Sequence, residues 1–210
     1  YTGLEFGLAG YRPHACDDVW KKRYGDCKDK SALLRAMLAR KGIRSHIVLL
    51  DTRGSGRNEK ASPSWQQFNH AILAVEQEAD GGYLFCDPTG KHLPAGTVGF
   101  GDLARDVLVL RDDRAEWVRT PDKLDAATRI RGDLTLSREG ELSGWFVYSA
   151  EGSDAAFYAE SFNGFDPQDL RKKLQEYAGA FFPGAEVIDV DYKPVKGPTA
   201  SFQCRAYFVR

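Results

Sequence analysis

The chain has 210 residues, of which 42% are hydrophobic and 28% charged, a composition typical of a globular protein. Its 29 Lys and Arg residues nearly balance 30 Asp and Glu residues, which excludes the basic surface that nucleic acid or an anionic membrane requires. Four cysteines occur without a CxxC pair, so we predict separate free thiols, no metal and no cofactor.

A strong helix signal follows a lead-in of weak periodicity. Asp26 is a candidate N-cap, and Asp29 lies three residues further on, as in a capping box. Apolar residues then recur at helical spacing until a stop at Gly42. The sequence therefore predicts a helix whose first turn contains Cys27.

Three β-rich segments follow, over residues 43–50, 68–75 and 83–86. Asp-Gly and Gly-Gly steps within residues 76–82 predict a hairpin between the last two, and Pro88 and Gly90 end the second strand. The polar stretch 51–64 is long enough to form a lid.

A charged stretch, residues 111–131, contains Pro121 and predicts a domain boundary, with a core over residues 1–121 and a smaller α+β accessory domain over 122–210. The second domain is expected to contain a hairpin about Gly140, a helix capped by Asp166, and strands over 187–192 and 201–209.

Cys27 is the candidate nucleophile because of its position. A helix N-terminus stabilises a thiolate through its unpaired N–H groups and dipole. The same N–H groups can bind the oxyanion that forms on an attacked carbonyl. Trp20 and Tyr24 are nearby candidates for a side-chain oxyanion donor.

A thiolate also needs a base, and the base needs an orienting acceptor. His70 and Asp87 lie on the two predicted hairpin strands. If paired residue numbers sum to about 157, the two residues lie directly opposite each other. A turn centred on Asp80-Gly81 would give a sum of about 161 and separate them, so the hypothesis requires the longer loop.

Three motifs in order, YGDCKDKSALL, FNHAIL and CDPTG, resemble those of the bacterial transglutaminase-like superfamily, in a branch whose core is flanked by β-rich domains of uncertain function. The resemblance implies an α+β, papain-like core in which Cys27 is the nucleophile, His70 the base and Asp87 the orienting residue. It also implies that an N-terminal segment of the core precedes Tyr1, and it favours an exported or periplasmic protein.

The expected chemistry is acyl transfer from a peptide or glutamine side-chain amide, in which Cys27 forms an acyl-enzyme. Water would give a peptidase or amidase, and an amine would give a transglutaminase; hydrolysis is favoured because no amine site is recognisable. The alternative is a non-catalytic or weakly active protein-binding scaffold that retains the fold. A zinc site formed by Cys27, His70 and Asp87 is disfavoured because it lacks a fourth ligand. Neither the individual substrate nor the oligomeric state follows from the residues.

Overall fold

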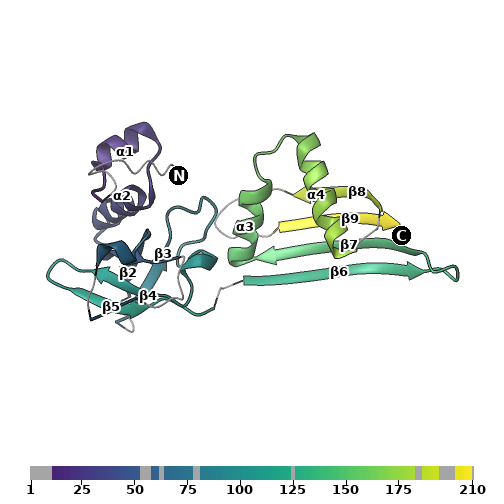
Figure 1. The fold of residues 1–210 in the computed structure, drawn as a ribbon. Coiled ribbons are helices and arrows are strands. Elements are labelled where there is room, and N and C mark those ends of the chain that lie inside the picture. Colours follow the sequence, from purple (N-terminus) through teal and green to yellow (C-terminus); the bar gives the residue numbers. More distant parts are fainter. Residues whose placement is uncertain are drawn as a thin grey trace. The chain divides into compact units, whose positions relative to one another are not determined.

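The computed structural model describes residues 11–52, 58–61, 64–77, 81–123, 126–182 and 186–193, together with the backbone of 202–209. The architecture is mixed α+β, with antiparallel sheets (Figure 1). The chain divides into two compact units, Tyr1–Leu124 and Asp125–Arg210. The predicted boundary lies close to this division, after residue 121.

The first unit contains a curled, five-stranded antiparallel sheet with strand order β3-β2-β1-β4-β5 (Figure 1). Its helices are α1 (Cys16–Lys22) and α2 (Cys27–Ala39), and its short 3-10 helices are η2 (Trp65–Gln67) and η3 (Phe100–Asp102). The strands are β1 (Ser45–Leu50), β2 (His70–Glu76), β3 (Tyr83–Cys86), β4 (Asp106–Leu110) and β5 (Ala115–Arg119).

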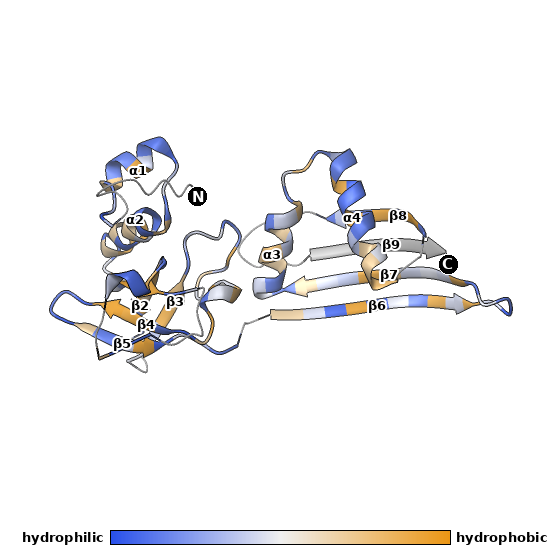
Figure 2. Cartoon of the chain, viewed as in Figure 1, coloured by the Kyte–Doolittle hydropathy of each residue, from blue (hydrophilic) through white to orange (hydrophobic). Residues whose placement is uncertain are grey.

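One apolar core holds this sheet together. Alternate residues of the central strands are fully buried in it, among them Val48, Ile72 and Val109, which is the period-two pattern of a strand with one face inside. Hydropathy follows the same division, since the central strands carry hydrophobic stretches while α1 is largely hydrophilic (Figure 2). Burial of these side chains contributes roughly 1.5–3 kcal/mol each.

Helix α2 packs against β1 and β2, and α1 packs against α2. The predicted capping box is confirmed: the Asp26 side chain accepts from the backbone N–H of Asp29, and the Asp29 side chain accepts from that of Asp26. Further along the helix, the buried Ser31 hydroxyl donates to the carbonyl oxygen of Ala71 at 3.1 Å. The helix is therefore fixed to β2 one residue beyond His70.

The charged stretch 111–131 contains the division between the two units, and it also contains β5 and the first half of β6, which are absent from the predictions. Both are edge strands of their sheets, so most of their side chains face solvent and can be charged. Because of this exposure, the sequence of the two strands lacks the alternation of apolar and polar residues that predicts a half-buried strand. Helix α1 is likewise absent from the predictions, because it has seven residues and its N-cap, Ala15, offers no capping side chain.

The second unit is a four-stranded antiparallel sheet with strand order β6-β7-β9-β8 and two helices packed on it. Its elements are β6 (Ala126–Leu136), β7 (Leu142–Glu151), α3 (Gly152–Phe162), α4 (Pro167–Phe181), β8 (Glu186–Lys193) and β9 (Phe202–Val209). The predicted turn at Gly140 is confirmed, with φ of 89°. The predicted cap is confirmed too, since the Asp166 carboxylate accepts from the N–H groups of Gln168 and Asp169.

Alternate side chains of β7, including Phe146 and Tyr148, form the core of the second unit with α3 and α4. Within it the Tyr148 and Tyr158 hydroxyls lie 2.7 Å apart, and Tyr158 also contacts the Tyr177 hydroxyl. The buried hydroxyls thus satisfy one another.

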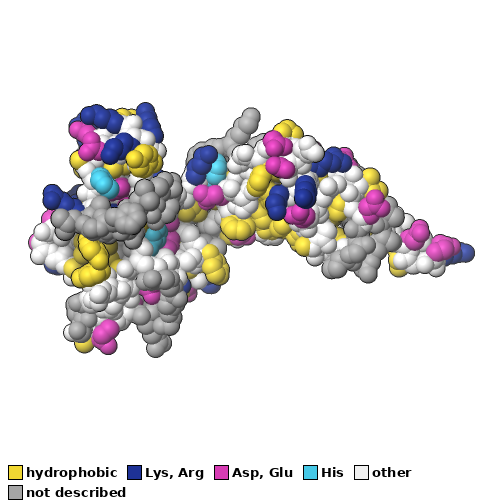
Figure 3. Space-filling view, turned by 45° about the horizontal axis from the view of Figure 1, so that its top comes forward, with side chains coloured by type: hydrophobic (Ala, Val, Ile, Leu, Met, Phe, Trp, Pro, Cys, Tyr) yellow, Lys and Arg dark blue, Asp and Glu magenta, His cyan; other side chains and the backbone are white. Residues whose placement is uncertain are grey.

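Acidic and basic side chains are interspersed on the surface shown in Figure 3. None of the helices in the described ranges combines the length and the apolar character needed to cross a bilayer.

Candidate active site

Cys27 is the first residue of α2, directly after the Asp26 cap. The thiol is buried, with 6% of the residue exposed. The cap satisfies the N–H of Asp29, and the Asp26 carbonyl accepts from that of Lys30. Among the described residues, the N–H groups of Cys27 and Lys28 are left as the first-turn donors that could bind an oxyanion.

The N-terminus of α2 is held by a residue outside it. His14 donates from its backbone N–H to Asp29 Oδ1 at 2.8 Å, and its ring Nδ1 lies 3.1 Å from Asp29 Oδ2. Burial opposes ionisation of Asp29, but the hydrogen bonds from His14 and Asp26 lower the pKa of the carboxyl below its usual value. The carboxyl group of Asp29 therefore stays ionised at neutral pH, and its negative charge interacts favourably with the positive, N-terminal end of the helix dipole.

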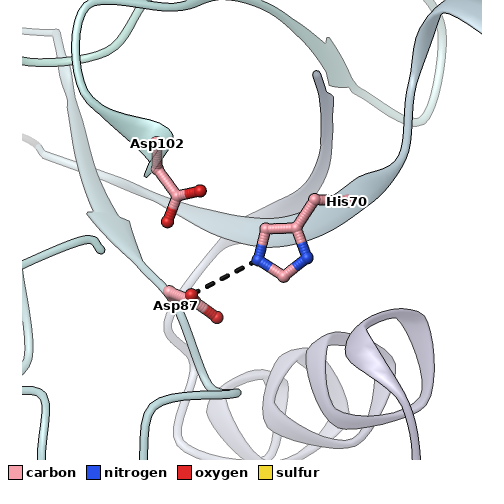
Figure 4. Close-up of side chains that lie close together, drawn as sticks. All are labelled: His70, Asp87 and Asp102. Carbon is pink, nitrogen blue, oxygen red and sulfur yellow. Dashed lines mark hydrogen bonds and ion pairs between the residues drawn. The ribbon is translucent and has the colours of Figure 1, made fainter. Parts of the chain in front are cut away.

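His70 is the first residue of β2, and Asp87 follows the last residue of β3. Figure 4 shows the two side chains facing each other, with His70 Nε2 donating to Asp87 Oδ2 at 3.3 Å. The structure thus brings together the two residues that the motifs assign as base and orienting acceptor.

The register that produces this contact differs from both predictions. Paired residues of β2 and β3, such as Leu73 and Cys86, have numbers that sum to 159 rather than 157 or 161. A backbone hydrogen bond from Gln77 to Gly82 closes the turn in this register. Asp87 is therefore the diagonal neighbour of His70 and not its direct partner. Diagonal neighbours share a face of the sheet and remain within reach of a long side chain.

The His70 ring is bound on two sides. Burial would lower its pKa, but hydrogen bonds with Asp87 and Cys27 and the charges of Asp87 and Asp102 raise it to about 10. Since Nε2 faces Asp87, Nδ1 is the nitrogen that remains for the thiol. At neutral pH the ring is an imidazolium, and an adjacent imidazolium stabilises a thiolate relative to a thiol.

Asp87 is itself fixed by the turn that follows β3. Its Oδ1 accepts from the Thr89 N–H at 2.8 Å and from the Thr89 hydroxyl at 2.7 Å. Burial opposes its ionisation, but hydrogen bonds from His70 and Thr89 lower the pKa of Asp87 below its usual value. Oδ2 remains directed at His70.

Asp102 completes the cluster and is absent from the sequence predictions. It ends η3, is only 3% exposed, and accepts from the Gly99 N–H at 3.1 Å. One side-chain atom of each of His70, Asp87 and Asp102 lies within 4.8 Å of the others. The segment that contains it, GFGD (residues 99–102), carries no periodic signal, and its approach to β2 depends on tertiary packing.

These three side chains could also be considered for a cation, because each offers one ligand atom. A cation would have to displace the proton that His70 Nε2 donates to Asp87. The high pKa of His70 opposes that displacement. The arrangement therefore favours a proton over a metal ion at this position.

Of the predicted oxyanion donors, Trp20 lies on α1 and Tyr24 precedes α2, and both are about half exposed. The Arg23 guanidinium lies 4.4 Å from the centre of the Trp20 ring. Within the described ranges, neither residue forms a hydrogen bond or a ring contact with Cys27 or His70. Half of the predicted lid, residues 53–57 and 62–63, lies outside those ranges.

No family model, curated protein or solved structure matches the chain.

Proposed function

We propose that the first unit is a thiol-dependent amide hydrolase of the transglutaminase-like kind, with a papain-like core. One observation supports this most strongly: His70 hydrogen-bonds Asp87, and the interaction of the same ring with Cys27, at the start of a capped helix, contributes to its raised pKa. A histidine with a packing role alone has no reason to lie between a thiol at a helix N-terminus and a carboxylate that is held in place by other hydrogen bonds.

In the proposed reaction, the Cys27 thiolate attacks the amide carbonyl carbon and forms a C–S bond. The oxyanion of the tetrahedral intermediate accepts hydrogen bonds from the first-turn N–H groups of α2. His70 gives its Nδ1 proton to the leaving nitrogen as the C–N bond breaks, which leaves a thioester. Asp87 keeps the ring oriented throughout.

His70, now neutral, accepts a proton from water as the water oxygen attacks the thioester carbonyl. Collapse of the second intermediate releases a carboxylic acid and regenerates the thiolate and imidazolium. An amine in place of water would form a new amide. No described residue forms an amine site, so hydrolysis is the proposed outcome.

A protein-binding scaffold that retains the core is the second candidate, and the burial of the site favours it. Cys27 is 6% exposed, and the side chains of His70 and Asp87 are 15% and 7% exposed. A substrate must reach the thiol through this small opening. In a scaffold the same three side chains would only stabilise the fold.

A peptide library that contains glutamine side chains separates the candidates. Peptide cleavage is followed by mass spectrometry and side-chain deamidation by release of ammonia, for wild type, Cys27→Ala and Cys86→Ala. A hydrolase gives turnover and a thioester adduct on Cys27, and of the two variants only Cys27→Ala abolishes both. If no adduct forms and product formation is the same in all three proteins, the scaffold is favoured.

A further inference from the structure

Asp102 is a buried carboxyl group that the proposed reaction does not use. Its side chain enters the cluster from η3, on a different segment from His70 and Asp87. Figure 4 shows its carboxyl group directed toward Asp87 and the His70 ring. A buried carboxylate normally requires a cation or several donors, since desolvation is unfavourable for a charge.

The donors around the two carboxyl groups are unequally shared. Asp87 Oδ1 has two donors from Thr89, and Asp87 Oδ2 has His70. Asp102 Oδ2 has one donor among the described residues, the Gly99 N–H, and a carboxyl oxygen of Asp102 lies within 4.8 Å of Asp87 and of the His70 ring. Two buried carboxyl groups this close do not both ionise readily, so one of them binds a proton more tightly. Asp87 has the larger share of donors, so the proton belongs to Asp102.

We propose that Asp102 is a positioning residue, which binds a proton beside Asp87 and, once ionised, faces the His70 ring with a second negative charge that helps to hold it as an imidazolium. The inference rests on the proposed function, because it assigns Asp102 a part in the same site. It goes beyond the Cys27, His70 and Asp87 motifs, which do not include residue 102.

The Asp102 proton makes the site sensitive to pH. Burial and the charge of Asp87 raise the pKa of Asp102 to about 6, while the charge of His70 opposes the rise. Below this pH Asp102 is neutral, and above it a second negative charge faces the imidazolium. Arg105, the nearest described cation on the same segment, donates to the backbone oxygens of Gly101 and Thr52.

The test follows the His70 ring by ¹⁵N NMR against pH in the full chain. Wild type should show two inflections in the His70 shifts, one near pH 6 from Asp102 and one near pH 10 from the ring itself. Asp102→Asn keeps the shape and removes the charge. It should abolish the lower inflection and move the upper one down by about one pH unit. Asp106→Asn, on β4, is the matched control and should preserve both inflections.

A purely structural role predicts a different result. If Asp102→Asn keeps the lower inflection, or leaves the upper one in place, the inference is overturned, whatever the library experiment shows. If the inflections change as expected but Cys27 forms no thioester, the role of Asp102 beside His70 stands and the hydrolase proposal fails. Asp102→Glu, which restores the carboxyl group, should restore a lower inflection.

Discussion

The pKa of His70 is strongly raised by its partners, and the shift has a consequence for stability. A group whose pKa is raised on folding stabilises the folded state fully below its unfolded value. That contribution disappears as pH rises through the folded value. For His70 the window runs from the ordinary histidine pKa of 6.5 to about 10.

We therefore predict that the free energy of unfolding falls between pH 6.5 and pH 10 by about 2–4 kcal/mol more in wild type than in His70→Gln. Urea denaturation at several pH values in this range measures the difference. If the free energy of unfolding changes with pH in the same way in both proteins, the partners of His70 do not stabilise its imidazolium form.

Asp102 should act in the same sense, at lower pH. Its raised pKa means that the folded state binds the proton more tightly than the unfolded state, so stability falls as pH rises from 3.8 through about 6. Asp102→Asn is expected to increase the free energy of unfolding at pH 8 by about 1–2 kcal/mol, and to leave it nearly unchanged at pH 4. A loss of stability at pH 8 would contradict this assignment.

At the scale of elements, the position of Cys27 depends on how α2 is held against β2. The Ser31 hydroxyl, one turn after Cys27, is buried and donates to the Ala71 carbonyl. Ser45 on β1 is a matched control, because its buried hydroxyl has no hydrogen-bond partner among the described residues.

Ser31→Ala should lower the free energy of unfolding by about 1 kcal/mol, since it leaves a buried carbonyl without its donor. Ser45→Ala should be neutral or slightly stabilising, because no bond is lost. Thermal or chemical denaturation of both variants gives the comparison. Equal losses in the two proteins would mean that the Ser31 bond does not hold the helix.

The start of α2 is the second point of attachment. Asp26→Ala removes the side-chain half of the cap and should lower the free energy of unfolding by about 1 kcal/mol. Gly25→Ala should also destabilise the protein, because a Cβ there would lie 2.8 Å from the Asp29 Cβ. Amide hydrogen exchange in the first turn of α2 should increase in both, and unchanged exchange would contradict the attachment.

Local rules explain which elements the sequence predicts well. The cap at Asp26 and the turn at Gly140 each depend on a few neighbouring residues, and both are found. Strand β4 depends on pairing with β1, far along the chain, and charged residues on the edge strand β5 hide its alternating pattern.

The candidate site shows the same division. Motifs identify Cys27, His70 and Asp87, and the structure brings these residues together. The register of the hairpin follows from the geometry of the turn between Gln77 and Gly82, which composition alone does not determine. Asp102 reaches the cluster from a segment without periodicity, so only the folded arrangement reveals it.

At the scale of the whole molecule, the candidate site belongs to one unit. Cys27, His70, Asp87 and Asp102 all lie within Tyr1–Leu124, whereas the second unit has its own core. A fragment of residues 1–124 should therefore retain the His70 inflections and a reactive Cys27. NMR and thiol labelling of the fragment test this expectation, and a folded fragment with an unreactive Cys27 would show that the site requires the second unit.

The rate of Cys27 alkylation by iodoacetamide at pH 6, mapped by peptide mass spectrometry, tests the central claim most directly. Burial raises the pKa of the Cys86 thiol, so this residue is a slow internal reference. If His70 and the helix stabilise a thiolate, Cys27 should react about 100-fold faster than Cys86, and His70→Ala should remove at least about tenfold of that advantage. Equal rates at the two cysteines, unaffected by His70→Ala, would contradict the account.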